Sequence, residues 1–314
     1  MQIYEYCQLC LGQKYMENHK SLFNIGVVER ETGIGKDTLR VWEKRYGFPL
    51  PVRDEGEDRL YPEEQVDKLR LIKRLLDVGM RPAKIVGLGV RELNALVHET
   101  PKIETTLSPE LLEFINLIKN HQATELRLAL NRTMLQQGLE DFLSKTISPL
   151  NQLVGDAWLR GEMRVFEEHL YSEQVTTVLR TVLVGIRDVN AAPRVLLTTL
   201  PGEEHGLGLL MAEATMSLCG ASCVLLGVQT PISEIVLAAR AHKSDVVTLS
   251  FSSAMPATQV KTGIEQLRKA LPDTVALWAG GAGVARQRNP LAGVELMGPL
   301  SDLTAAVKSW RDAH

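Results

Sequence analysis

Residues 194–218, with the sequence RVLLTTLPGEEHGLGLLMAEATMSL, join a short apolar run to a helical pattern through a loop with one histidine and three glycines. The apolar run has the length and composition of a buried strand, and the segment after Gly208 has the apolar content of a packed helix. A strand that passes directly into a helix begins a βαβ unit, whose strands lie parallel. The stretch therefore predicts an α/β domain with His205 at the carboxyl end of its first strand.

The same alternation continues to the end of the chain. After the first run come ASCVLLG, DVVTLSF, TVALWAG and GVELMG, each short, apolar or β-branched, and followed by a helical segment. Five such units predict a doubly wound, flavodoxin-like (Rossmann-type) α/β domain over residues 193–314.

Residues 109–190 have a different pattern, which is helical throughout. Apolar residues recur at three- and four-residue spacing in LLEFINLIKN, ELRLALNRTMLQQ, LEDFLSKTISPLNQLVGDAWL and VFEEHLYSEQVTTVLRTVLVGI. Four such segments with short joints predict an up-down helical bundle. The other boundaries that we predict are a tail over 1–20, a module of short helices over 21–92 and a linker over 93–108 that contains Pro101.

The composition is that of a soluble globular protein, since 45% of the 314 residues are hydrophobic and 23% are charged. No apolar run approaches the ~20 residues of a membrane-spanning helix and no secretory signal is visible, so we expect a cytoplasmic protein that does not contact membranes. A net charge of −3 argues against nonspecific polyanion binding. Cys7 and Cys10 have the spacing of half a zinc site, but no second pair follows, so a disordered tail is the other interpretation. Met16 is an alternative start.

The N-terminal module contains two helical stretches, IGVVERETG and KDTLRVWEKRYG, which meet at Gly33-Ile34-Gly35. This size and turn chemistry predict a helix-turn-helix, whose second helix enters the major groove of DNA. The residues expected in its core are Ile25, Val27, Val28, Leu39, Val41 and Trp42. The cations that share one face of the second helix are Lys36, Arg40, Lys44 and Arg45. Charge alone favours a solvated helix, because residues 36–61 carry six basic and six acidic side chains.

The order of the following segments is more specific. FPLPVR, the polar turn DEGED, RLY and a helix that opens at Pro62 follow in turn. Together with TLRVWEKRYG, RLYP and DVGM, this order resembles the DNA-binding domain of the MerR family. The resemblance implies a homo-oligomer on double-stranded operator DNA. It also implies that DNA phosphates or base edges meet Lys36, Thr38, Arg40, Arg45 and Tyr46 on the recognition helix and Arg59 and Tyr61 on the wing.

The loop around His205 is part of a second pattern. Glu203-x-His205-x-x-Gly208 alone favours an ordinary polar loop histidine. It lies, however, at the carboxyl edge where open sheets bind ligands. Ser250-Phe-Ser252 follows at the end of the third strand and Gly280-Gly281 at the end of the fourth. These three elements in this order resemble the cobalamin-binding domain.

This resemblance gives each residue type a chemical reason. A neutral imidazole binds cobalt from below while an acid holds its other ring nitrogen, so His205 is the expected metal ligand and Glu203 its partner. The family usually has Asp in place of Glu203, which leaves the tightness of this hydrogen bond open. Small residues make room for the nucleotide tail and the macrocycle, and these are Gly208, Ser250, Ser252, Gly280 and Gly281.

The bundle adds a third pattern, Trp158 followed after nine residues by Glu168-His169. Taken alone, these residues are equally compatible with a bundle core and a solvated helix start. Beside the cobalamin pattern they resemble the cap over the upper cobalt face in CarH-type photoreceptor repressors, which use adenosylcobalamin. In that family a histidine follows the tryptophan, and here Leu159 stands in its place. A leucine cannot coordinate cobalt, so light sensing requires His169 or another group in that role.

Three functions follow from these patterns. The first is a transcriptional repressor without enzymatic activity, which senses adenosylcobalamin, and light, through a change of oligomeric state. The second is a MerR-type regulator that has lost cobalamin and senses another ligand or a protein partner, which Leu159 and Glu203 keep open. The third is the corrinoid carrier subunit of a methyltransferase, which the DNA-binding pattern and the lack of a catalytic barrel disfavour.

Overall fold

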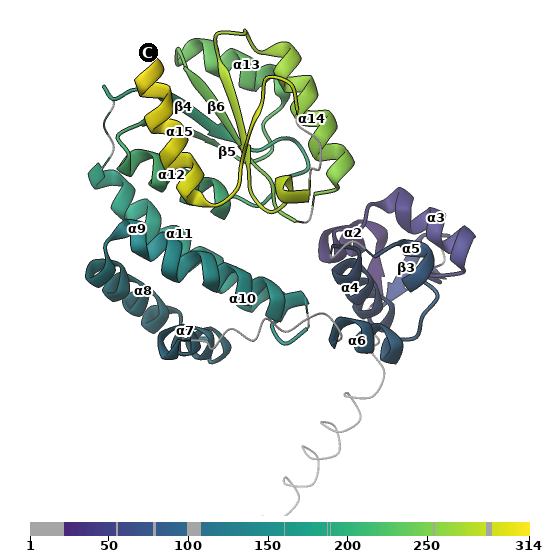
Figure 1. Ribbon diagram of the computed structural model, residues 1–314. Coiled ribbons are helices and arrows are strands. Elements are labelled where there is room, and N and C mark those ends of the chain that lie inside the picture. The colour runs from purple at the N-terminus through teal and green to yellow at the C-terminus, as the bar shows by residue number, and fades with distance from the viewer. Residues whose placement is uncertain are drawn as a thin grey trace, which may run out of the picture. The chain divides into compact units, whose positions relative to one another are not determined.

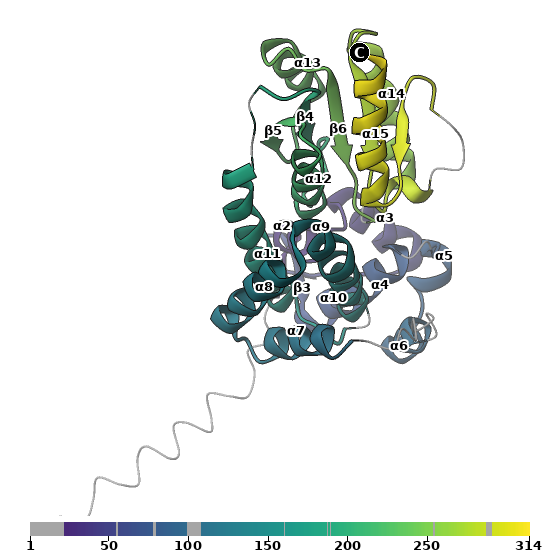
Figure 2. The same ribbon diagram turned by 60° about the vertical axis from the view of Figure 1, so that its left-hand side comes forward.

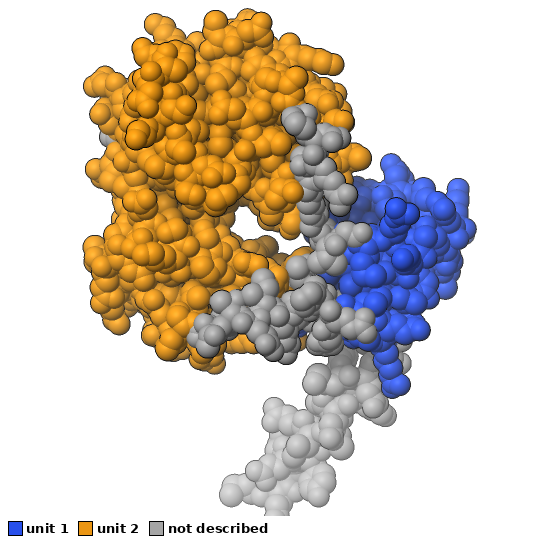
Figure 3. Space-filling model, viewed as in Figure 1, with its two compact units in different colours: residues 1–103, 159–161 blue, residues 104–158, 162–314 orange. Residues whose placement is uncertain are grey.

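The computed structural model consists of two compact units, which are described separately (Figure 3). Unit 1 comprises residues 1–103 and 159–161, and unit 2 comprises residues 104–158 and 162–314. The residues that the structure describes are 22–54, 56–77, 80–98, 108–159, 161–186, 188, 190–253, 255–286 and 291–314.

Unit 1 has the predicted helix-turn-helix and wing. Its helices are α2 (Ile25–Thr32), α3 (Lys36–Tyr46), α4 (Glu63–Asp77), α5 (Pro82–Ile85) and α6 (Val90–His98). The Asn24 side chain accepts a hydrogen bond from the Val27 amide at the start of α2, and Gly33 ends this helix at φ +65°. The strands are β1 (Leu22–Asn24), β2 (Val52–Arg53) and β3 (Arg59–Pro62), in the antiparallel order β1-β3-β2. The sequence analysis missed β1, which pairs with the wing strand β3 ahead of the first helix.

The core of unit 1 differs from the expectation at Val41, and Ile25 and Val27 are only half-buried. Val28, Leu39 and Trp42 are buried as predicted, but the Val41 residue is 54% exposed. Val41 lies between the two buried positions of α3 and on the other side of the helix, so that prediction was wrong. In addition, α6 continues through His98 and takes up the first part of the predicted linker.

The first part of unit 2 is the predicted bundle (Figure 1). Its segments are α7 (Pro109–Lys119), α8 (Ala123–Gln137), α9 (Leu139–Asp141), η1 (Phe142–Ile147), α10 (Ser148–Leu159) and α11 (Val165–Ile186). The third of the four expected helices is thus a succession of α9, the π-helical η1 and α10. Its core is aliphatic and aromatic, and it includes three residues from outside the bundle, Leu210, Met211 and Ala214.

The second part of unit 2 is a five-stranded parallel sheet in the order β5-β4-β6-β7-β8, which confirms the doubly wound α/β fold. The strands are β4 (Arg194–Thr198), β5 (Ser222–Gly227), β6 (Val246–Ser250), β7 (Ala276–Gly280) and β8 (Glu295–Met297). The helices between and after them are α12 (Leu207–Leu218), α13 (Ile232–Ala241), α14 (Ala257–Ala270), the 3₁₀ turn η2 (Val284–Arg286) and α15 (Leu300–Ala313). Helices α12 and α15 cover one face and α13 and α14 the other (Figure 2). Within the described ranges, no helix has the length and apolarity needed to span a bilayer.

Helix α12 belongs to two cores at once. Leu209, Ala212 and Met216 pack with the sheet and α15, whereas Leu210 and Met211 pack with the bundle. Every residue of α12 from 209 to 217 is buried, because apolar structure lies on both sides of the helix. The chain order strand, His205 loop, α12 therefore places the candidate ligand at the end of a helix that is fixed from two directions.

Candidate functional site

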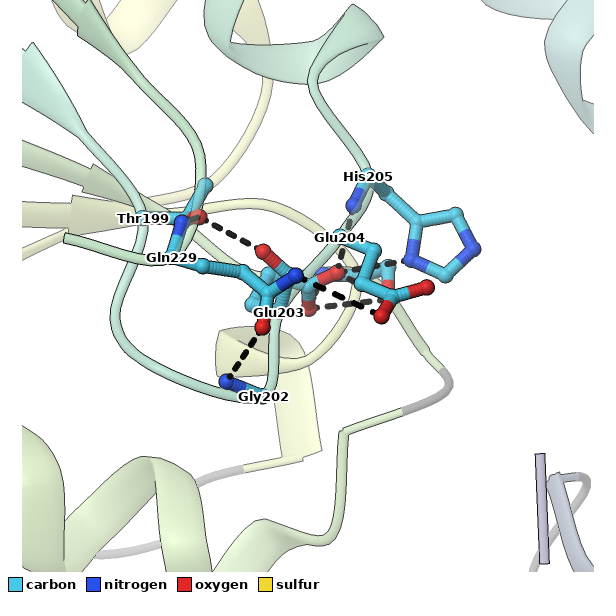
Figure 4. Close-up of polar contacts among 7 residues, drawn as sticks. Thr199, Gly202, Glu203, Glu204, His205 and Gln229 are labelled. Atoms are coloured by element: carbon cyan, nitrogen blue, oxygen red, sulfur yellow. Dashed lines mark hydrogen bonds and ion pairs between the residues drawn. The ribbon is translucent and has the colours of Figure 1, made fainter. Parts of the chain in front are cut away.

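The His205 loop holds the imidazole by a short hydrogen bond (Figure 4). His205 Nδ1 lies 2.7 Å from Glu203 Oε1, and the His205 amide donates to the same oxygen at 3.0 Å. The Glu203 side chain is 1% exposed and the His205 side chain is 62% exposed. Because the carboxylate only accepts, Nδ1 carries the proton of the neutral ring and Nε2 keeps its lone pair. Nε2 has no hydrogen-bond partner within the described part of the chain, so it is available to a ligand.

The Glu203 carboxylate is itself held in place by the end of a neighbouring strand. The Ser252 amide donates to Glu203 Oε2 at 2.8 Å, and the Ser252 hydroxyl lies 2.9 and 3.0 Å from the two carboxylate oxygens. Sequence analysis expected Ser252 only to make room for the ligand tail. The structure shows that it also fixes the acid that orients the imidazole. The longer Glu in place of Asp thus makes a short hydrogen bond to the histidine.

Two residues that the sequence analysis missed hold the backbone of this loop. The Thr199 hydroxyl donates to the Glu203 carbonyl at 2.7 Å and accepts from the Gln229 amide at 2.8 Å. The Gly202 amide donates to Gln229 Oε1 at 3.3 Å. Gln229 has φ +58°, which is unusual for a residue with a side chain. The position of Thr199 just after the first strand was the one sequence signal for its role in the loop. A lone threonine or glutamine belongs to no motif, so neither residue could be recognised.

The contact between Glu203 and His205 lowers the pKa of the acid and raises the pKa of the imidazole, which favours an ion pair. Burial by itself raises the pKa of Glu203, but hydrogen bonds from His205 and Ser252 outweigh burial and leave the pKa below its usual 4.5. The hydrogen bond to Glu203 raises the pKa of His205 above its usual 6.5, against the opposing effect of burial. The Glu168 and Glu204 carboxylates also raise the pKa of His205. This environment therefore favours the protonated ring more than water does, and a metal ion that bound Nε2 would compete with a proton for it.

The glycines near the loop have packing reasons of their own. A Cβ on Gly281, at φ +96°, would come within 2.4 Å of the Phe251 carbonyl oxygen. Gly280 pairs with Ser250 across β6 and β7, and a Cβ on Gly208 would lie 3.0 Å from Ser250 Oγ. The ends of these strands and the start of α12 thus approach closely in the region where the tail is expected.

Two buried polar atoms lie below this region without a partner. Thr248 and Trp278 are register partners on β6 and β7, two residues before Ser250 and Gly280 and hence on the same face. They are 3% and 1% exposed, and Thr248 Oγ1 and Trp278 Nε1 have no hydrogen-bond partner in the described structure. Such a buried group costs about 1–3 kcal/mol, so the pair fits a ligand tail that brings hydrogen-bonding atoms between the sheet and α12. The sequence analysis did not find either residue.

The expected cap lies on the bundle side of unit 2. Glu168 Oε1 accepts from the Ser172 hydroxyl at 2.6 Å, and Glu168 Oε2 lies 3.6 Å from His169 Nε2. The negative charge of Glu168 also raises the pKa of His205. Trp158 is half-buried near the end of α10, whereas the His169 side chain is 73% exposed. The side chain of Leu159 and both N-terminal cysteines, Cys7 and Cys10, lie outside the described residues. Figure 3 shows the surface of unit 2 hollowed between the bundle and the sheet.

In unit 1 most expected DNA contacts lie on the surface of α3. Lys36, Thr38, Arg40 and Arg45 are exposed. Arg40 pairs with Asp37 at 2.9 Å, and Lys36 pairs with Glu29 at 3.3 Å. The Arg45 guanidinium lies over the Tyr46 ring, 5.4 Å from its centre. The predicted helix face therefore presents cations, some of which have acidic neighbours of their own.

Of the two wing residues expected to contact DNA, Arg59 is partly available and Tyr61 is buried. Arg59 Nε donates to Glu43 Oε2 at 3.1 Å, which ties the wing to α3 and leaves the two terminal nitrogens without a hydrogen-bond partner in the described structure. Tyr61 was expected to meet a phosphate, but it is 0% exposed and its hydroxyl lies in the core of unit 1. Its ring packs the wing from the inside, so Tyr61 is not placed to touch DNA.

We expect His205 to titrate above pH 6.5 in the cobalamin-free protein, and Glu203→Gln to lower its pKa toward that value. The stabilising contribution of Glu203 is lost as pH falls through its lowered pKa, and that of His205 as pH rises through its raised pKa. An NMR titration of the ring signals, with His205→Ala for assignment, measures both proteins. A wild-type pKa at or below 6.5 contradicts this hydrogen-bond geometry.

Comparison with known proteins agrees with this arrangement. Residues 23–88 match the family of MerR HTH family regulatory proteins, and residues 112–183 and 193–299 each match a B12 binding domain family. In structure, a monomethylamine corrinoid protein of Methanosarcina barkeri superposes with a TM-score of 0.52 at 18% identity, over 63% of this chain and 96% of that one. This likeness shows a shared fold.

Two curated relatives cover most of the chain. The HTH-type transcriptional repressor CarA of Myxococcus xanthus is 31% identical over 262 residues, which are 82% of this chain and 86% of CarA. The repressor CarH of the same organism is 28% identical over 280 residues, 83% of this chain and 89% of CarH. The chain therefore belongs to the family of MerR-type transcriptional repressors, with CarA and CarH, in which a helix-turn-helix domain is joined to B12-binding domains.

Proposed function

We propose that this chain represses transcription from a double-stranded operator as a homo-oligomer whose assembly is controlled by adenosylcobalamin. The observation that carries the proposal is the His205 imidazole, whose Nε2 is unpaired in the described structure while buried Glu203 fixes Nδ1. A solvent-exposed loop histidine without a ligand role needs no such support. The alternative of a regulator that has lost cobalamin leaves this arrangement without a reason.

Cobalamin, when bound, would supply a cobalt centre that a neutral imidazole can ligate. In this proposal His205 would be the protein's cobalt ligand, and Glu203 with Ser252 would hold its ring in the required direction. The buried polar atoms of Thr248 and Trp278 would bind the nucleotide tail, for which Gly208, Ser250, Gly280 and Gly281 would leave room. Trp158, Glu168 and His169 would form the cap over the cofactor.

We propose that a light response in this chain would use a different cobalt-binding residue in the cap from that of CarH-type proteins. Leu159 has no donor atom for cobalt, whereas His169 carries an exposed imidazole beside Glu168. We propose that His169 would be the residue of the cap that binds cobalt in the light-exposed protein.

DNA binding is assigned to the exposed face of α3 and to the wing. Thr38, Arg40 and Arg45 lie on that face, and Arg59 offers its terminal nitrogens to a phosphate. One such module neutralises few phosphates, so strong binding requires two or more copies on one operator. Adenosylcobalamin controls binding to the extent that it favours the assembly that presents these copies together.

We expect the purified protein to bind adenosylcobalamin in the dark and to become coloured. Loss of the cobalt ligand in His205→Ala abolishes the protein-ligated visible spectrum, and Glu203→Gln weakens binding about 10- to 100-fold because the ring is no longer oriented. Glu204→Gln is the matched control, since Glu204 is exposed and contacts Gln229 rather than the imidazole. Titration of the visible spectrum measures each affinity.

A wild-type protein that stays colourless in this titration supports the alternative function, a regulator of another ligand or partner. Equal affinities of Glu203→Gln and Glu204→Gln contradict the role of Glu203.

Assembly provides a second test. We expect adenosylcobalamin in the dark to increase the mass of the oligomer, and green light to reverse this change. Size-exclusion chromatography with light scattering measures the mass in the four combinations of light and cofactor. The same mass in all four contradicts control by assembly.

We expect Arg45→Ala to weaken binding to a duplex that the wild type has selected from a random library. Removal of one phosphate contact lowers the slope of log affinity against log salt by about 1 per protomer. Arg127→Ala makes the same charge change on the exposed surface of α8 in unit 2 and serves as control. If Arg45→Ala and Arg127→Ala give the same slope of log affinity against log salt, Arg45 does not contact a DNA phosphate.

A further inference from the structure

A short chain of polar contacts joins the bundle to α12. The Tyr171 hydroxyl on α11 donates to Asn151 Oδ1 on α10 at 2.5 Å, and Asn151 Nδ2 donates to Met211 Sδ on α12 at 3.1 Å. Tyr171 is 2% and Met211 5% exposed, and both belong to the bundle core. Apolar side chains tolerate sliding, whereas a buried hydrogen bond is satisfied in one register only.

Each member of this chain lies on a segment that carries part of the candidate cobalamin site. Tyr171 follows Glu168 by about one turn of α11. Asn151 precedes Trp158 by about two turns on α10, and Met211 lies in the second turn of α12, which begins directly after the His205 loop. The contact thus joins the two helices of the cap to the helix that supports the lower ligand.

The hydroxyl of Tyr171 is suited to this link. Burial raises its pKa well above the usual 10.0, and the nearby Glu168 carboxylate adds to the shift. The side chain therefore stays a neutral donor at all physiological pH values. The Glu168 carboxylate that adds to this shift also raises the pKa of His205.

We propose that Tyr171 and Asn151 are positioning residues that fix the separation between the cap, Trp158 and Glu168, and the His205 loop, and so set the affinity for cobalamin. This inference rests on the proposed function. Neither residue is assigned a contact with the cofactor. Their effect passes through Met211 and the register of α12.

The experiment compares two variants that each lose one buried hydroxyl. Tyr171→Phe removes the proposed link. Thr146→Val removes the hydrogen bond from Thr146 Oγ1 to Gln137 Oε1 (2.9 Å), which lies within the bundle and does not involve α12. Urea unfolding of the cobalamin-free proteins and titration with adenosylcobalamin in the dark are measured for both.

We expect both variants to unfold at lower urea than the wild type, and only Tyr171→Phe to bind adenosylcobalamin about 5- to 10-fold more weakly. Asn151→Leu, of similar volume, breaks both contacts and is expected to weaken binding at least as much. Tyr171→Phe then adds little in the Asn151→Leu background, because the two residues act as one link. Asn151→Leu also serves as the second test if Tyr171→Phe does not fold.

Wild-type affinity in Tyr171→Phe and Asn151→Leu, with stability lowered as in Thr146→Val, overturns the inference and leaves these residues a purely structural role. Failure of the wild type itself to bind cobalamin overturns the proposed function and this inference together. The two failures are distinguishable, since only the second appears in the unaltered protein.

Discussion

Burial of α12 on two sides is the constraint on which the organisation of unit 2 depends. The sheet needs a helix on this face to cover Val195, Leu197 and Trp278, and the bundle needs Leu210 and Met211 to complete its own core. A single apolar helix meets both needs, so the bundle and the sheet fold as one unit. The loop that precedes this helix is thereby fixed relative to both layers, which makes it a suitable place for a ligand that touches both.

The elements that could be predicted from the sequence are those with a strong local signal. The alternation of strands and helices predicted the doubly wound sheet, and the helical spacing predicted the bundle. The resemblance to the cobalamin-binding domain implied the contact between Glu203 and His205, and only the structure shows that this hydrogen bond is short. The fold and the Glu203–His205 pair could therefore be predicted from short sequence patterns.

Contacts between distant segments were not accessible in this way. Thr199, Gln229 and Ser252 meet around the His205 loop because three strands end at one edge. Only the folded sheet shows that Ser252 bonds to the Glu203 carboxylate, whereas Thr199 and Gln229 hold the backbone of the loop. Burial within unit 1 was misjudged for the same reason. Val41 has the composition of a core residue but points outward, whereas Tyr61 has a hydroxyl that suits a phosphate but is enclosed by the core. Long-range packing decides such cases, and a motif does not describe it.

The rigidity of the lower loop has a consequence for how a signal leaves this site. Hydrogen bonds from Ser252 and His205 to Glu203 hold the imidazole in one direction, so in the proposed function the ring loses little rotational freedom when a ligand binds Nε2. The proposal therefore places any conformational change on ligand binding away from this loop, toward the bundle, where the His169 side chain is 73% exposed.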